Sequence, residues 1–109
     1  MEITVETRQG HTVLRPSGRL DLAAAESLRR RFATERADGH RWFVVDLAGV
    51  GFVDTSGVGA LVAGFKGARQ DGGDLRLASP CDQARLVLRL TGLEQVLGAY
   101  ETVEHALAA

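Results

Sequence analysis

The tetrad Asp54-Thr55-Ser56-Gly57 sets a carboxylate, two hydroxyls and a glycine between two apolar segments, of which the first reads as a strand. Such a group can cap a helix, hold a phosphate, supply a nucleophile or accept a phosphoryl group from a kinase. Capping is the simplest reading, because Asp54 or Thr55 can accept hydrogen bonds from the free N–H groups of a helix beginning near Ser56 or Gly57. Capping does not explain Gly57 and Gly59, each of which weakens a helix by about 1 kcal/mol relative to alanine. We interpret them as space for the backbone of a partner protein.

The residues that this tetrad would need for catalysis are not found in suitable positions in the sequence. A serine nucleophile requires a neighbouring base, and the histidines His11, His40 and His105 fall at a strand start, in a loop and in a terminal helix. No G-x-S-x-G elbow is present. The segment around Lys66 lacks the glycine spacing and the Lys-Ser/Thr pair of a phosphate-binding loop. Catalysis by this tetrad is therefore disfavoured.

Other reactive side chains also have plainer readings. Asp46 and Asp54 form a carboxylate pair with no third ligand, so we predict neither a metal nor a cofactor. Cys81 reads as a small buried hydrophobic residue. The arginines are typical of a solvated helix face rather than of a nucleic-acid patch: Arg29, Arg30, Arg31, Arg36 and Arg41.

Composition indicates an ordinary globular protein. The chain has 109 residues, of which 45% are hydrophobic and 25% charged, with a net charge of -1, so we expect one domain spanning residues 1–109 and no direct contact with nucleic acid or an anionic membrane. The single cysteine excludes an internal disulfide framework. No signal peptide or apolar membrane span is visible, and a cytoplasmic location is the expectation.

Strand and helix patterns alternate along the chain. Residues 2–7 and 11–16 read as an antiparallel hairpin, and 17–21 as a turn in which Gly18 ends the second strand. Asp21 is placed to cap a helix that ends at Asp38-Gly39 and whose inner face holds Ala25, Leu28 and Phe32. The continuous apolar run 42–47 reads as the central strand of a sheet covered on both faces.

The second half of the chain continues the alternation. A helix after the tetrad, with an inner face at Val58, Leu61, Val62 and Phe65, runs to the turn 71–74 and is followed by a strand over 75–78. A third helix after Pro80 has an apolar stripe of Leu86, Val87, Leu90 and Leu93, interrupted at Thr91-Gly92. We then expect a short strand near Val96-Leu97 and a last helix capped by Thr102, with Val103 and Leu107 one turn apart. The fold class is thus α/β, a small, mostly parallel sheet with an N-terminal antiparallel hairpin and flanking helices.

This order of elements, the GRLD segment at 18–21 and above all DLAGVGFVDTSGVGALV at 46–62 resemble the STAS domain of the anti-sigma factor antagonists. The segment RLASPCDQARLVLRLTGLEQVL at 76–97 resembles the fourth strand and third helix of that family, so the resemblance covers almost the whole chain.

The resemblance implies a phosphorylation switch without catalysis by the chain itself. In that family the hydroxyl residue before the motif glycine is phosphorylated, which corresponds to Ser56 here, with Thr55 as the secondary candidate. The unphosphorylated antagonist binds an anti-sigma factor that is also a serine kinase and so frees a sigma factor; phosphorylation releases it, and a metal-dependent serine phosphatase resets it. The implied partner-binding residues are Ser17, Gly18, Asp21, Asp54, Thr55, Ser56, Gly57 and Gly59.

A second reading of the same resemblance is a non-switching module. STAS domains also serve as structural or scaffold subunits, in lipid-transport complexes and stress-sensing assemblies, where the phosphorylation site is often degenerate. The serine in the DTSG tetrad favours the switch.

Overall fold

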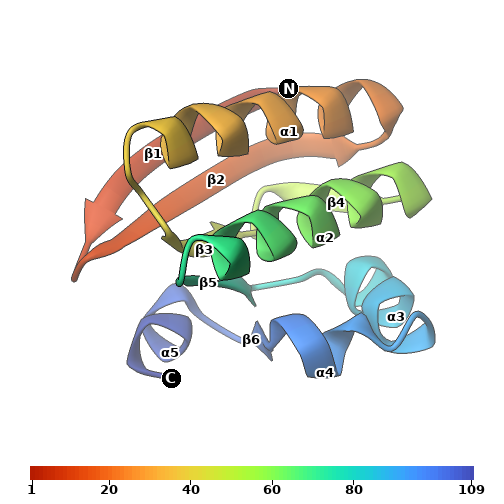
Figure 1. Cartoon of the computed structure of the whole chain (residues 1–109). Helices are drawn as coiled ribbons and strands as arrows, with labels where there is room; N and C mark the ends of the chain where they lie inside the picture. The colour runs from red at the N-terminus through yellow and green to blue at the C-terminus, as the bar shows by residue number, and fades with distance from the viewer.

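The computed structural model describes all residues, 1–109, as a mixed sheet covered by helices (Figure 1). Helices α1 and α2 run side by side over one face of the sheet, while the C-terminal helix α5 covers the other. No helix has both the length and the apolar character needed to cross a membrane. In chain order the elements are β1 (Glu2–Arg8), β2 (His11–Leu20), α1 (Leu22–Ala37), β3 (Trp42–Asp46), β4 (Val50–Val53), α2 (Thr55–Gln70), β5 (Asp74–Ala78), α3 (Asp82–Leu90), α4 (Leu93–Leu97), β6 (Ala99–Tyr100) and α5 (Val103–Ala108).

The strands are arranged in the order β1-β2-β3-β5-β6, with β4 also paired to β2. Only the β1–β2 hairpin is antiparallel; the pairs β2–β3, β2–β4, β3–β5 and β5–β6 are all parallel. Residues Thr12–Leu14 of β2 pair with β3, and residues Gly18–Leu20 pair with β4. The predicted fold class is therefore confirmed, and the long strand β2 has two successive partners along one edge.

The prediction that Gly18 ends the second strand is wrong. Strand β2 continues through Gly18 to Leu20, and the register of its pairing with β4 shifts between Gly18 and Arg19. Gly18 has φ +109°, a conformation that glycine adopts without steric cost. The strand can therefore bulge here and still pair with β4, with the Gly18 N–H donating to the Gly49 carbonyl at 2.9 Å.

The hydrophobic core lies on both faces of β3, as the continuous apolar run predicted. Phe43 and Val45 belong to the larger cluster beneath α1 and α2, whereas Val44 faces a smaller cluster formed with α5. Phe32 of α1 packs edge to face against Phe43, with the two ring centroids 5.7 Å apart.

The C-terminal region differs from the prediction in two respects. Leu86 and Leu90 are 50% and 77% exposed, while Ala84 and Leu88 are buried. Helix α3 begins only at Asp82, with the Cys81 thiol accepting a hydrogen bond from the Ala84 N–H. Val87 and Leu93 of the predicted stripe do pack against the core, so the inward face coincides with the predicted one only in part. The break at 91–92 and the last helix, capped by Thr102, are confirmed.

The expected strand at 96–97 is instead the end of helix α4, and strand β6 follows two residues later. A sequence of five residues, LEQVL, fits one helical turn as well as a short strand. Gly98, at φ +68°, then reverses the chain and brings Ala99 and Tyr100 beside β5.

Candidate functional site

Two parallel strands end side by side at one edge of the sheet. Leu20, the last residue of β2, pairs with Val53, the last residue of β4, and the Asp54 N–H donates to the Leu20 carbonyl at 3.2 Å. Asp21 and Asp54 directly follow these paired residues. The pairing of β2 with β4 therefore brings the GRLD and DTSG segments together, although 33 positions separate the two aspartates in the sequence.

Both aspartates cap the helices that begin at this edge. The Asp21 carboxylate accepts a hydrogen bond from the Ala24 N–H at 3.1 Å, and the Asp54 carboxylate accepts one from the Gly57 N–H at 3.0 Å. Of the two predicted caps of α2, Asp54 rather than Thr55 fills the role. Helix α2 begins at Thr55, so Ser56 is its second residue.

Ser56 lines an open hollow between the first half of α1 and the first turn of α2. The hollow is lined by Leu22, Ala25, Glu26, Arg29 and Ser56. Ser56 is half-buried and Thr55 is exposed. Both hydroxyls are thus within reach of an enzyme that approaches this edge, and the edge carries several carboxylates.

The two glycines of the tetrad region have different surroundings. Gly57 is buried, and a β-carbon there would lie 2.4 Å from the Leu20 carbonyl oxygen and 2.7 Å from Leu20 Cγ. The interpretation that Gly57 leaves space for a partner's backbone is wrong, since β2 of the same chain fills that space. Gly59 is half-buried, and a β-carbon there would meet only the terminal Nη2 of Arg29, at 3.0 Å.

The other predicted interface residues lie on the same edge. Ser17 and Gly18 are exposed on the last part of β2, beside the turn at Gly49 that leads into β4. Arg19, also exposed, stacks its guanidinium over the Phe52 ring at 4.0 Å from the centroid. The edge therefore has a continuous surface running from 17–19 to the helix starts.

Gln83 holds the strand that leads into the tetrad, and the sequence analysis missed it. Strand β4 pairs only with β2, so its other edge is open. From α3, the Gln83 amide oxygen accepts from the Val53 N–H and its NH₂ donates to the Val53 carbonyl, both at 2.8 Å. The side chain thus satisfies the backbone one residue before Asp54. A single glutamine at a helix start has no pattern that would have pointed to this role.

Asp46, His11 and His40, considered above as alternative site residues, contact other side chains in the structure. Asp46, at the end of β3, accepts hydrogen bonds from Arg15 Nε at 3.1 Å and from the Ala48 N–H at 3.0 Å, whereas Asp54 caps α2. His11 packs edge to face against Trp42, and His40 lies 3.8 Å from the Glu35 carboxylate. No histidine lines the hollow at Ser56.

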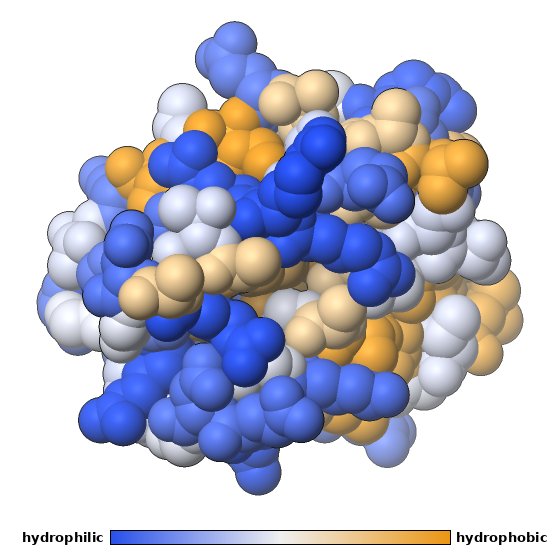
Figure 2. Space-filling view, turned by 45° about the horizontal axis from the view of Figure 1, so that its top comes forward, coloured by the Kyte–Doolittle hydropathy of each residue, from blue (hydrophilic) through white to orange (hydrophobic).

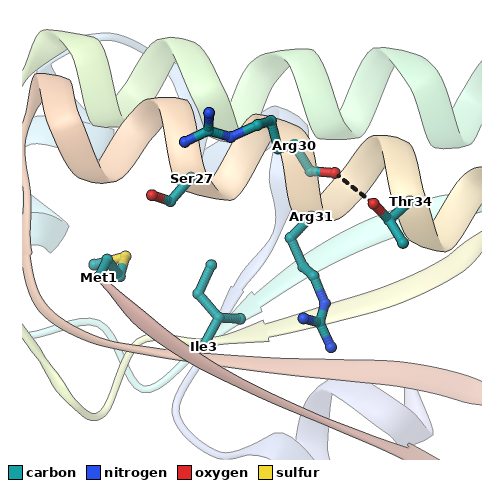
Figure 3. A pocket seen from close by; sticks show the side chains of 6 residues that line it. All are labelled: Met1, Ile3, Ser27, Arg30, Arg31 and Thr34. Atoms are coloured by element: carbon teal, nitrogen blue, oxygen red, sulfur yellow. Dashed lines mark hydrogen bonds between the residues drawn. The ribbon is translucent and has the colours of Figure 1, made fainter.

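The arginines of α1 do not converge on one ligand. A second hollow, between α1 and β1, is lined by Met1, Ile3, Ser27, Arg30, Arg31 and Thr34 (Figure 3). Its two guanidinium groups point in different directions (Figure 3), and Arg31 contacts Glu35 at 3.3 Å. Seen from the side of α1, hydrophilic residues cover most of the surface, with scattered hydrophobic patches (Figure 2).

One arginine of α1 forms a firm ion pair across to the end of α2. Arg36 Nε donates to Asp71 Oδ2 at 2.8 Å and its Nη2 to Oδ1 at 3.2 Å. The hydrogen bonds from Arg36 hold the pKa of the Asp71 carboxyl below its ordinary value, and Asp71 in turn raises the pKa of Arg36. This pair lies at the far end of the two helices from Ser56.

Comparison with known proteins agrees with this architecture. A curated relative, the anti-sigma F factor antagonist of Paenibacillus polymyxa, is 26% identical over 98% of this chain and 92% of its own length. The crystal structure of an anti-sigma factor antagonist from Mycobacterium paratuberculosis is 27% identical, with a TM-score of 0.88 over 98% of this chain and 91% of that one.

The Bacillus cell fate determinant SpoIIAA in its phosphorylated form is 25% identical, with a TM-score of 0.77 over 98% of this chain and 97% of that one. The family model described as STAS domain matches residues 2–106, nearly the whole chain. On the sequence motifs, the sheet topology and this match, the chain belongs to the STAS domain family.

Proposed function

We propose that this chain is an anti-sigma factor antagonist that works as a phosphorylation-controlled partner switch. Unphosphorylated, it binds an anti-sigma serine kinase and so frees a sigma factor; phosphorylated on Ser56, it is released until a metal-dependent serine phosphatase resets it. The observation that carries the proposal is a half-buried serine hydroxyl at the accessible start of α2, in a chain whose relatives are named anti-sigma factor antagonists. A solved structure of SpoIIAA in a phosphorylated form supports such a modification.

The proposed binding surface is the sheet edge at the helix starts. It comprises Ser17, Gly18, Asp21, Asp54, Thr55, Ser56 and Gly59, which lie around the ends of β2 and β4. Gly57 contributes to this surface indirectly, because its missing side chain lets α2 sit close to Leu20.

A phosphate on Ser56 should cost little free energy in the free protein and several kcal/mol in the complex. At the first turn of α2 the phosphate adds about -1.5 to -2 charges where helix N–H groups and the dipole favour an anion, so the fold tolerates it. Against a partner shaped for a neutral hydroxyl, the same charge beside Asp54 would be buried without compensation, which costs several kcal/mol. Since 1.4 kcal/mol is a factor of about ten in affinity, such a cost releases the partner.

The direct test incubates the chain with its anti-sigma kinase and ATP and maps the phosphate by peptide mass spectrometry. We expect it on Ser56; modification only of Thr55 or of another residue would contradict the assignment. By titration calorimetry, Ser56→Ala should bind the kinase like the wild type, whereas Ser56→Asp should bind more weakly, with a single carboxylate charge imitating phosphate in part.

The position of the surface needs a separate control. Asp21→Ala, at the proposed edge, should lower affinity for the kinase, and Glu104→Ala, on α5 at the opposite face of the sheet, should not. If Glu104→Ala lowered the affinity and Asp21→Ala did not, the interface would lie near α5 and the proposed surface would be wrong. Circular dichroism of the phosphoprotein should remain that of a folded chain, since Ser56 lies in the first turn of α2, where the helix N–H groups favour an anion.

A further inference from the structure

We propose that Arg29 is the receptor within the chain for a phosphate on Ser56. The phosphoseryl dianion and the Arg29 guanidinium would form an ion pair across the hollow that Ser56 and Arg29 both line. This inference rests on the proposed function in taking Ser56 as the modified residue, and it adds a specific binding group for the modification.

The geometry brings the two side chains to one face. Ser56 and Gly59 are three residues apart on α2 and therefore lie on the same side of the helix. Arg29 Nη2 reaches across from α1 to within 3.0 Å of the position that a Gly59 β-carbon would occupy. Arg29 and Ser56 also line the same open hollow. Because Gly59 has no side chain, this position leaves the space between the guanidinium and a phosphate one turn earlier open.

Arg29 is free to take up a new anion. It is exposed and forms none of the ion pairs of the chain, whereas Arg31 is held by Glu35 and Arg36 by Asp71. A guanidinium can bind two phosphate oxygens at once, which a point charge cannot. The modification would thus recruit the one arginine on this part of α1 that lies beside Ser56 and has no carboxylate partner.

The remaining charged groups around Ser56 are carboxylates, so a cation there would offset their repulsion of a phosphate. Glu26 lines the same hollow, Asp54 caps α2 two residues before Ser56, and Asp21 caps α1 at the neighbouring strand end. The N–H groups at the start of α2 favour a phosphate dianion, whereas the three carboxylates repel it. Arg29 is the cation that lines this hollow.

The consequence for regulation is that phosphorylation changes two groups of the surface at once. The phosphate adds negative charge, and the pairing turns Arg29 inward, so that its guanidinium is no longer available to a partner's carboxylate. A kinase that recognises both the Ser56 hydroxyl and a free Arg29 would therefore lose two contacts in one step.

The test measures the second pKa of the phosphoserine by ³¹P NMR titration. Phosphoserine is introduced at position 56 during translation, so that the measurement does not depend on any kinase. An adjacent guanidinium favours the dianion and lowers this pKa, which is about 6 for a free phosphoserine. Arg29→Gln should therefore raise it by roughly 0.2–0.7 of a pH unit, the range expected of an exposed ion pair.

Arg30→Gln is the matched control, because Arg30 is the next residue, is also exposed, and lines the hollow on the other side of α1. It should leave the pKa of the phosphoserine within about 0.1 of a unit. An unchanged pKa in Arg29→Gln, or equal shifts in the two variants, would overturn the inference. Failure of a kinase to modify Ser56 would count against the proposed function alone, since the encoded phosphoserine is present in either case.

Discussion

Two alanine substitutions on the same turn of α2, Gly57→Ala and Gly59→Ala, should change stability in opposite directions. At Gly57 the added methyl would lie 2.4 Å from the Leu20 carbonyl oxygen and 2.7 Å from Leu20 Cγ. An ordinary contact requires about 3.5 Å, so α2 must move about 1 Å away from β2. That movement strains the Asp54 N–H bond to the same carbonyl, which already measures 3.2 Å.

The magnitudes follow from the two environments. Overpacking against a fixed backbone atom costs about 1–3 kcal/mol, and we expect Gly57→Ala to lose that much stability. Gly59→Ala meets only the flexible end of Arg29, so the helix preference of alanine should dominate and raise the free energy of unfolding by up to about 1 kcal/mol. Each kcal/mol shifts the melting temperature of a domain of this size by roughly 4–8 °C.

Urea denaturation and calorimetry of both variants beside the wild type provide the assay, with far-ultraviolet circular dichroism to check the fold. A Gly57→Ala protein as stable as the wild type would show that the close approach of α2 to Leu20 is not required. A Gly59→Ala protein destabilised as much as Gly57→Ala would show that Arg29 cannot move aside.

Two further predictions concern contacts away from Ser56. Gln83→Ala removes both hydrogen bonds to the Val53 backbone and should lower the free energy of unfolding by about 1–3 kcal/mol. The control Gln95→Ala, exposed on α4, should change it by less than about 0.5 kcal/mol. Equal effects in urea denaturation would contradict a stabilising role of these two hydrogen bonds. Asp71→Asn should be less stable than the wild type at neutral pH. Because Arg36 lowers the Asp71 pKa below 3.8, the pair stabilises the fold above that pH, and this stabilisation is lost as the pH falls through the lowered pKa. The stabilities of the two proteins should therefore become equal in acid. A constant difference in stability down to pH 2 would contradict this origin.

Local patterns were sufficient for most of the elements and for three of the caps. Leu28 and Phe32 lie about one helical turn apart, and residues 42–47 form a continuous apolar run. Both patterns arise from burial within a single element, so the sequence predicted α1, β3 and their places in the core. Asp21, Asp54 and Thr102 were identifiable as caps because a capping side chain bonds to an N–H only three residues away.

Tertiary structure decided what depends on contacts between distant segments. That Gly18 bends β2 instead of ending it depends on β4, which offers a partner more than 30 positions later. Gly57 and Gly59 look alike in the sequence, yet Leu20 fills the space beside one and a movable arginine lies beside the other. The inward face of α3 likewise depends on how the helix packs against β4 and the core, and the two hydrogen bonds from Gln83 to Val53 depend on the open edge of β4. These features are set by packing between segments far apart in the chain. The type and spacing of neighbouring residues do not indicate which distant segment will pack against them.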